Sequence, residues 1–288
     1  MRSIVLALLG SLCFAFSNVA IHRGLQGTDY FTGLLVNLAS NAVLLWIFLA
    51  FTSESAEIWV PVNLIFLGVG LVVPGLARYF IFKGMERLGS SISSVLLNSA
   101  PLFAILFALF FLEEIPTLTN LAGALFIVGG IVSLSWKGES RTWRTADLGF
   151  PLAAAFLFAL RDNLVRFGLL IIQSPILGAS IAATTSAVTM GAVYLTGESR
   201  RNWEGASGKG LWHFFVSGFL NFLSYVFMYT ALALDRVSIV SPLVNSSSLF
   251  LLPIAHFMLR DVEQITARKI YAAGMVLFGV LLISWEKM

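Results

Sequence analysis

Long apolar stretches follow one another along the whole chain, separated by short polar connections. Each is roughly 20 residues long, the length that crosses the hydrocarbon core of a bilayer as a helix. About ten occur. They lie near residues 4–21, 31–51, 62–84, 92–112, 118–136, 148–172, 176–196, 211–232, 238–259 and 268–285. The connections are too short to form a soluble domain. The pattern therefore predicts an all-α integral membrane protein with ten transmembrane helices.

The chain contains an internal repeat. Residues 90–114 align with residues 237–261 at a constant offset and without gaps. The positions Ser91, Ile92, Ser94, Leu96, Asn98, Leu102, Phe103, Ala108, Phe110 and Leu112 recur as Ser238, Ile239, Ser241, Leu243, Asn245, Leu249, Phe250, Ala255, Phe257 and Leu259. A repeat of this length fixes the architecture. We expect a first five-helix repeat over 1–136, a linker over 137–147 and a second five-helix repeat over 148–288.

Five helices in each half is an odd number, so the two repeats must enter the membrane in opposite senses. Inverted repeats of this kind are a recurring design of secondary transporters, which bind substrate near the midplane between the halves. The pattern thus predicts a central cavity and alternating access without ATP.

Composition supports a membrane location. Of 288 residues, 58% are hydrophobic and only 11% are charged, with a mean hydropathy of +0.89. Soluble domains carry about 25% charged residues. The net charge of +3 fits basic loops on the cytoplasmic side better than a nucleic-acid partner, and the distribution of Lys and Arg predicts both termini outside. The first apolar stretch is interpreted as a helix rather than a signal peptide, and Cys13 leaves no internal disulfide.

Arg161 and Asp162 lie almost in the middle of the sixth apolar stretch. A charge at the bilayer centre costs about 2.5 to 17 kcal/mol, so such residues are candidates for function. Asp162 and Arg166, four residues apart, are expected to pair along one face, which leaves Arg161 for a substrate. The alternative is an ion pair that only locks the helix bundle. Arg78 and Tyr79, just after a proline in the third stretch, form a second candidate site; Arg78 is either a partner for Asp162 or a cation facing substrate.

The eighth stretch carries a polar and aromatic stripe. Its members recur every three or four residues and therefore share one helix face: Ser217, Asn221, Ser224, Tyr225 and Tyr229. The stripe is either a cavity wall or polar contact between helices. Asn98 and Asn245 are equivalent positions of the two repeats, which suits a binding site on the pseudo-axis and equally suits symmetric packing. Gly123 with Gly130 and Ala272 with Gly279 predict packing seams in the fifth and tenth helices, and Glu113 and Glu114 are expected to reach water.

Motifs for other chemistry are not found in the sequence. The segment 205–210 lacks the spacing of a nucleotide-binding loop. No metalloprotease pair and no nucleophile elbow occurs. We therefore expect no cofactor, no metal and no enzymatic activity.

Several of these segments resemble the EamA-type ten-helix members of the drug/metabolite transporter superfamily, over nearly the whole chain. Residues 16–21 are similar to a Trp-Gly-Ser-Asn-Phe stretch of that family, with Phe and Ser in the first two places. Residues 90–114 are similar to its Ala/Ser-rich segment with Pro101 at mid-helix and a closing Gly-Glu, here Glu113-Glu114. Gly123 and Gly129-Gly130 match glycines of its fifth helix.

The resemblance implies a basket of ten helices around a central cavity, with the fifth and tenth at the periphery. It also implies efflux of amino acids, other metabolites or drugs, a location in the bacterial inner membrane and cytoplasmic termini, the last against the charge distribution. Family members that export aromatic amino acids present aromatic residues where this chain has Arg78 and Arg161. We therefore expect a monomeric exporter of a small polar metabolite bearing a carboxylate. The alternatives are an exporter of drug-like or cationic compounds and a membrane-embedded enzyme.

The predicted substrate-binding residues divide by chemistry. The arginines attract an anionic group, the tyrosines receive the apolar part, and the asparagines donate hydrogen bonds. The set is Arg78, Tyr79, Asn98, Arg161, Asp162, Asn221, Tyr225, Tyr229 and Asn245.

Overall fold

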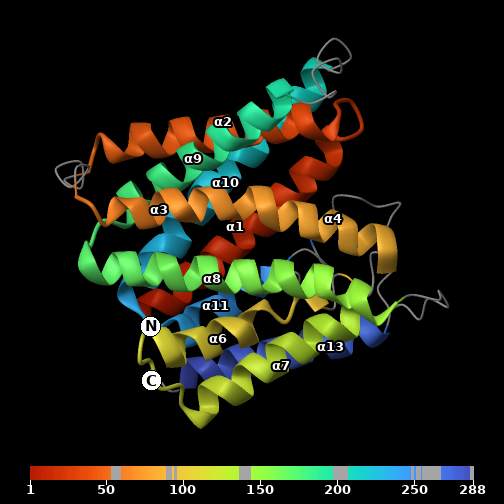
Figure 1. Ribbon diagram of the computed structural model, residues 1–288. Coiled ribbons are helices and arrows are strands. Elements are labelled where there is room, and N and C mark those ends of the chain that lie inside the picture. The colour runs from red at the N-terminus through yellow and green to blue at the C-terminus, as the bar shows by residue number, and fades with distance from the viewer. Residues whose placement is uncertain are drawn as a thin grey trace.

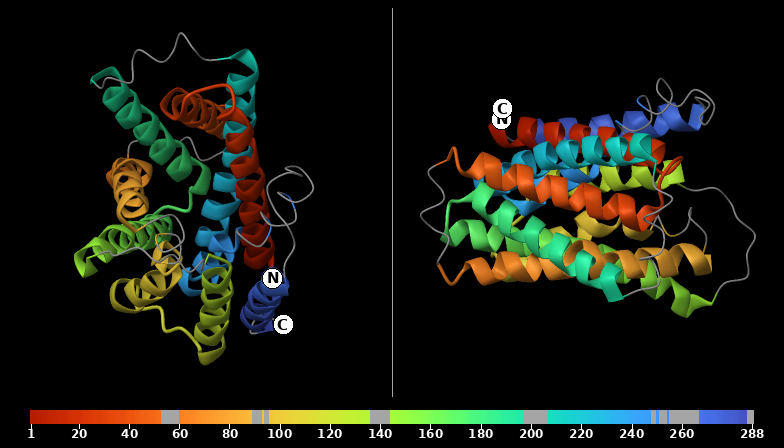
Figure 2. Two further views of the ribbon diagram at one scale, coloured as in Figure 1. Left: turned by 90° about the vertical axis from the view of Figure 1, so that its right-hand side faces the viewer. Right: turned by 90° about the horizontal axis from the view of Figure 1, so that it is seen from above.

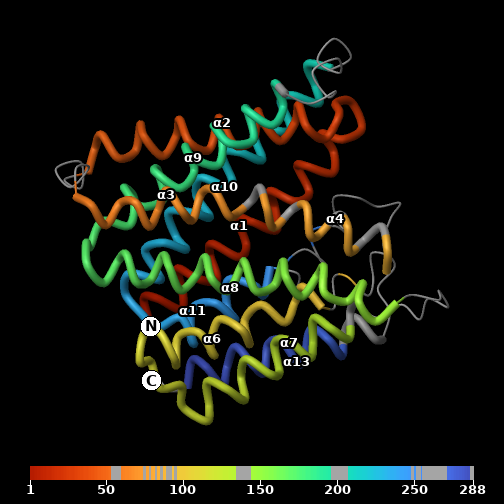
Figure 3. Tube along the Cα trace, in the orientation of Figure 1, coloured from red at the N-terminus to blue at the C-terminus, as the bar shows by residue number. Residues whose placement is uncertain are grey.

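The computed structural model describes residues 1–52, 60–88, 93, 96–135, 144–196, 207–247, 250, 254 and 267–285 (Figure 3). Regular structure in this part of the chain is helical. Helices of the first half are α1 (Arg2–Gly24), α2 (Tyr30–Leu49), α3 (Asn63–Gly70), a π-helical turn (Leu71–Leu76), α4 (Ala77–Leu88), α6 (Ala100–Phe111) and α7 (Leu118–Ser135). Those of the second half are a 3₁₀ turn (Thr145–Leu148), α8 (Gly149–Ile171), α9 (Pro175–Thr196), α10 (Gly208–Leu234), α11 (Val237–Asn245) and α13 (Ala267–Trp285).

Within the described residues, five helical segments are long and apolar enough to cross a membrane: Arg2–Gly24, Tyr30–Leu49, Thr145–Ile171, Pro175–Leu195 and Gly208–Leu234. Four further apolar helices are shorter. Parts of the predicted stretches 92–112 and 238–259 and of the predicted linker 137–147 lie outside the described residues. The described part of the structure therefore supports an all-helical membrane protein.

The third predicted stretch is bent, as its proline requires. Val73 has φ −127° and ψ 126°, an extended conformation inside the π-helical turn that joins α3 to α4. The residue before a proline is driven away from the helical region by the pyrrolidine ring, and Pro74 follows here. The hydroxyl of Ser186 on α9 donates to the carbonyls of Gly70 and Val73 at 3.0 and 2.9 Å. The backbone carbonyls that the bend leaves without helical partners therefore accept hydrogen bonds from a neighbouring helix.

The helices lie side by side as one bundle (Figures 1 and 2). The amino-terminal helix α1 packs along α10, and α10 also contacts α2. At the edge of the bundle α7 packs along α13, which agrees with peripheral fifth and tenth helices. The start of α1 and the end of α13 lie at the same end of the bundle (Figure 1), called here the termini end.

Candidate functional site

Arg161 lies one residue from the centre of the 23-residue helix α8, and its guanidinium pairs with the adjacent Asp162. Nε and Nη2 both donate to Oδ1 of Asp162, at 2.9 and 2.7 Å. The two side chains are 13% and 3% exposed. The predicted pairing of Asp162 with Arg166 is therefore wrong. Neighbouring side chains do diverge on a helix, but the long arginine stem curves back, and burial among apolar groups favours the nearest opposite charge.

The second oxygen of Asp162 is held from another helix. Ser241, at the centre of α11, donates its hydroxyl to Oδ2 at 2.7 Å. Asn245, one turn further on, donates to the carbonyl of Ser241 at 2.8 Å. Both carboxylate oxygens therefore have donors, which offsets part of the cost of burying the charge.

Two tyrosines of α10 complete the group. The rings of Tyr225 and Tyr229 stack with centroids 5.8 Å apart and planes at 18°, so the predicted face of α10 brings them together. Both lie within electrostatic range of Arg161, whose guanidinium carbon lies 5.1 Å from the ring centroid of Phe158. Tyr229 is 0% exposed, and within the described structure its hydroxyl has no hydrogen-bond partner. We call these residues the Arg161 cluster: Arg161, Asp162, Ser241, Asn245, Tyr225 and Tyr229.

Both copies of the repeat interrupt the helix at the same place. Ser99 donates its hydroxyl to the carbonyl of Leu96 at 2.6 Å, and Ser246 donates to Leu243, also at 2.6 Å. These pairs occupy equivalent positions of the alignment. The predicted continuous helix over 92–112 is wrong here, because Asn98 and Ser99 form a turn before α6. In the second copy α11 ends at Asn245.

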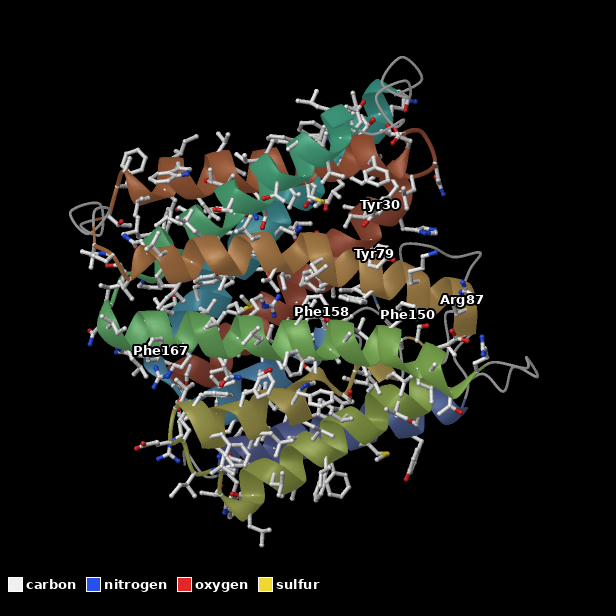
Figure 4. The ribbon with its side chains drawn as sticks, in the orientation of Figure 1. Tyr30, Tyr79, Arg87, Phe150, Phe158 and Phe167 are labelled. Atoms are coloured by element: carbon white, nitrogen blue, oxygen red, sulfur yellow. The ribbon has the colours of Figure 1, made fainter. Side chains whose placement is uncertain are left out.

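Other predicted site residues lie apart from the cluster. Tyr79 is 54% exposed, and its ring contacts Phe80 of the same helix. Figure 4 places it on α4 and Phe158 on the neighbouring α8. The side chain of Arg78 lies outside the described part of the structure. Asn98 is half-buried in the turn before α6. The assignment of these three residues to a substrate site stays a prediction.

Asn221 belongs to a polar contact among α1, α2 and α10. Its amide donates to Oδ1 of Asn37 at 3.0 Å, and the amide of Asn37 donates to the hydroxyl of Ser217. Ser217 also lies 2.9 Å from the hydroxyl of Ser17. Two turns beyond Ser217, Ser224 donates to the carbonyl of Gly10 at 2.8 Å. This part of the stripe therefore holds helices together, which was the alternative interpretation, whereas Tyr225 and Tyr229 stack on each other within electrostatic range of Arg161.

The expectation that Glu114 reaches water is wrong. Its side chain is 8% exposed, and Oε1 accepts from Nε of Arg166 at 3.2 Å. Burial raises the pKa of Glu114 above its ordinary value, although Arg166 and the backbone N–H of Val237 act in the opposite direction. One feature of the sequence could have indicated a role for Glu114: the equivalent position of the second copy is also acidic, Asp261. Asp261 lies outside the described residues.

A second unpredicted residue is Asn163, beside the charge pair. Its amide donates to the carbonyl of Ala104 on α6 at 3.0 Å and to that of Ala159 at 2.9 Å. It therefore fixes α8 against α6 next to Asp162. One amide in an apolar stretch carries no periodicity, so the pattern offered no means of finding it.

The Arg161 cluster combines a compensated charge pair with groups that still lack partners. Arg161 uses Nε and Nη2 for Asp162, and among the described residues Nη1 makes no hydrogen bond. A guanidinium has five N–H donors in a planar fork that fits a carboxylate. The buried hydroxyl of Tyr229 is a further donor. The arrangement can therefore bind an anionic oxygen group next to an aromatic surface.

Comparison with known proteins gives a consistent result. The model of the EamA-like transporter family, which belongs to the drug/metabolite transporter superfamily, matches residues 1–136 and 147–285. A solved structure described as the crystal structure of a protein matches with a TM-score of 0.78, covering 99% of this chain and 96% of that one at 14% identity, which shows the fold alone. No curated protein matches. The chain therefore belongs to the EamA-like transporter family and is an integral membrane transporter.

Proposed function

We propose that the protein is a secondary exporter of a small metabolite that bears a carboxylate, with the substrate held at the Arg161 cluster. The observation that carries the proposal is the buried Tyr229 hydroxyl, which has no partner in the described structure although it belongs to a side chain within electrostatic range of Arg161. An unpaired buried hydroxyl costs about 1–3 kcal/mol. A carboxylate bound to Nη1 of Arg161 would accept from that hydroxyl and remove the cost.

The proposed route of transport is alternating access between two inverted halves. In support, α1 begins at the termini end of the bundle, whereas α8, the first helix of the second half, ends there (Figure 1). Interruptions at equivalent positions, beside Ser99 and Ser246, resemble the discontinuous helices that line the binding sites of inverted-repeat transporters. Asn245, at one of these interruptions, is joined to Asp162 through Ser241.

An exporter of organic cations is the second candidate, and the geometry favours it less. A cationic substrate would need a carboxylate to receive it, and both oxygens of Asp162 already accept hydrogen bonds from Arg161 and Ser241. The aromatic faces of Tyr225 and Tyr229 suit a cation, yet they adjoin a guanidinium that would repel it.

A thermal-shift screen of the purified protein in detergent tests the proposal. The panel contains amino acids, dicarboxylates, nucleosides and organic cations, because a ligand that binds the folded state stabilises it by mass action, about 2.7 kcal/mol at a concentration of 100 Kd. Tyr229→Phe removes only the hydroxyl and is expected to weaken binding of a carboxylate about tenfold. Flux of the same compound into proteoliposomes should fall in parallel.

Tyr194→Phe is the matched control. The hydroxyl of Tyr194 on α9 is also buried without a partner in the described structure, but no contact joins it to the Arg161 cluster there. This variant should bind the ligand as the wild type does. Stabilisation by organic cations alone, or by carboxylates equally in wild type and Tyr229→Phe, would refute the proposed site.

A further inference from the structure

The termini end of the bundle is held by a network that joins the two halves of the chain. Glu114, in the connection between α6 and α7, belongs to the first half. Its Oε1 accepts from Nε of Arg166 on α8 at 3.2 Å, and its Oε2 accepts from the backbone N–H of Val237 at 2.8 Å. Arg236 donates from Nη1 to the carbonyl of Ile115 at 3.2 Å. All three contacts cross from one repeat to the other.

Arg166 also closes the corner between α10 and α11. Its Nη1 donates to the carbonyl oxygens of Leu232 and Ala233, at 2.7 and 3.0 Å. These carbonyls lie in the last turn of α10, where backbone carbonyls have no hydrogen-bond donor within their own helix. The N–H of Val237, at the start of α11, likewise has no acceptor within its own helix. Glu114 and Arg166 together therefore satisfy both helix ends. The corner is bound to the first half through Glu114 and through the Arg236 contact. Ser3 on α1 adds a further contact, because its hydroxyl donates to Oδ2 of Asp235 at 2.5 Å.

Stability alone does not explain a buried ion pair at this place. Replacing such a pair by apolar residues is often neutral or stabilising, and the best-attested role of a buried pair is to specify one arrangement over another. The raised pKa of Glu114 agrees, because it means that the surroundings as a whole disfavour the charge in spite of Arg166. A buried pair of this kind can specify one position of the two halves at a cost in stability.

We propose that Glu114 and Arg166 form a latch that keeps the termini end of the bundle closed and breaks whenever the binding site opens to that side. The latch rests on the proposed alternating-access function, in which one half moves against the other. It differs from the Arg161–Asp162 pair, which lies within one helix and can persist through the movement. Loss of the latch shifts the population toward the state that is open at the termini end.

Distances between spin labels on the two halves test this directly. In the full chain with Cys13→Ser, labels are attached to cysteines that replace Leu118 at the start of α7 and Gln173 after α8, both of which are exposed. The protein is measured in lipid nanodiscs without substrate. The wild type should give mainly one distance. Glu114→Gln and Arg166→Gln should each produce a second, longer distance. The population at this longer distance, relative to the population at the main distance, should rise about tenfold, because either change breaks the same pair.

Glu113→Gln is the matched control, since this neighbouring carboxylate is exposed. It should leave the distance distribution unchanged. If Glu114→Gln does not remain monodisperse and helical, Glu114→Asp takes its place. This variant keeps the charge but shortens the side chain, so the population at the longer distance should rise by a smaller factor. A folded Glu114→Gln protein with the wild-type distribution would overturn the latch. The measurement needs no substrate, so its result is independent of whether the Arg161 cluster binds a carboxylate.

Discussion

Glu113 stands out among single residues because its backbone has φ 53°. This left-handed conformation costs an L-residue about 1–2 kcal/mol, whereas glycine adopts it readily. It ends α6: the N–H groups of Leu112 and Glu114 both donate to the carbonyl of Ala108, at 3.1 and 3.0 Å. Glycine is the usual residue after a helix in this motif, and the Gly-Glu of the family pattern falls on Glu113-Glu114.

Glu113→Gly should therefore stabilise the protein by about 1 kcal/mol, because it removes the conformational cost at an exposed site. The midpoint of thermal unfolding in detergent measures the effect. Glu113→Ala removes the same carboxylate but retains a Cβ, so it should not reproduce the gain. A gain of equal size with alanine would point to the charge rather than the backbone.

Tyr229→Phe should have opposite effects on stability and binding. Without ligand, the variant no longer buries an unpaired hydroxyl, so we expect a gain of about 1 kcal/mol in unfolding free energy. The same gain is expected for Tyr194→Phe, but only Tyr229→Phe should lose affinity for a carboxylate. Destabilisation by Tyr229→Phe would mean that the hydroxyl has a protein partner and is not held open for a ligand.

At the scale of single residues, the sequence predicted where the ionisable groups lie but not which residues they pair with. Arg161 and Asp162 were predicted at mid-span, and the spacing of Tyr225 and Tyr229 placed them on one face. Which carboxylate each arginine meets depends on contacts between distant segments. The Arg166–Glu114 pair joins residues 52 positions apart, and helical spacing within one element cannot reveal such a contact.

Among the elements, the fourth and ninth predicted helices differ most from expectation. Hydrophobicity continues across Asn98 and Asn245, and a periodic pattern therefore predicts continuous helices. Serine hydroxyls compete for backbone carbonyls and favour the ends of helices, as Ser99 and Ser246 do. The serine runs were visible in the sequence, but their effect depends on local geometry that hydropathy does not contain.

The seam between α7 and α13 was predicted from small residues and is confirmed. A Cβ added to Gly279 would lie 2.5 Å from the carbonyl oxygen of Gly123 and 3.0 Å from the backbone nitrogen of Ile127. A Cβ on Gly123 would lie 2.8 Å from the carbonyl of Gly279. Backbone atoms cannot move aside as a side chain can, so the helices approach this closely only with glycine.

Gly279→Ala should destabilise the protein by about 1–3 kcal/mol, the usual cost of overpacking. Gly274→Ala on the same helix is the control, because an added Cβ there meets no atom within 4 Å. The control should be neutral or stabilising by up to about 1 kcal/mol through helix propensity. Unfolding midpoints of both variants in detergent check the difference, and equal midpoints would show that α7 and α13 do not pack as described.

At the scale of the whole molecule, the sequence predicted the helical class and the family but not how the two halves contact each other. The repeat shows that the halves are related, whereas the network at the termini end joins Glu114 and Ile115 of the first half to Arg166, Arg236 and Val237 of the second. Contacts between the two halves can be found only when both halves are placed together.

The latch predicts an unusual dependence of stability on pH. The pKa of Glu114 is raised in the folded protein, chiefly by burial, relative to about 4.3 in an unfolded chain. The folded state therefore binds the proton more tightly, and this contribution to stability is complete below the unfolded pKa and is lost as pH rises through the folded pKa. The glutamine of Glu114→Gln cannot titrate, so the variant does not lose this contribution. Its unfolding midpoint should therefore rise relative to that of the wild type as the pH increases from the unfolded to the folded pKa of Glu114.

Thermal unfolding of the two proteins at a series of pH values from about 4 to 8 measures the difference. Glu113→Gln, whose side chain is exposed, should follow the wild type throughout. A Glu114→Gln protein that loses stability relative to the wild type as pH rises would show that Arg166 more than compensates for burial. The pair would then act as an ordinary stabilising contact. The expected result, in contrast, leaves a pair that costs stability while it joins the two halves, which is the property that a latch between two states of a transporter requires.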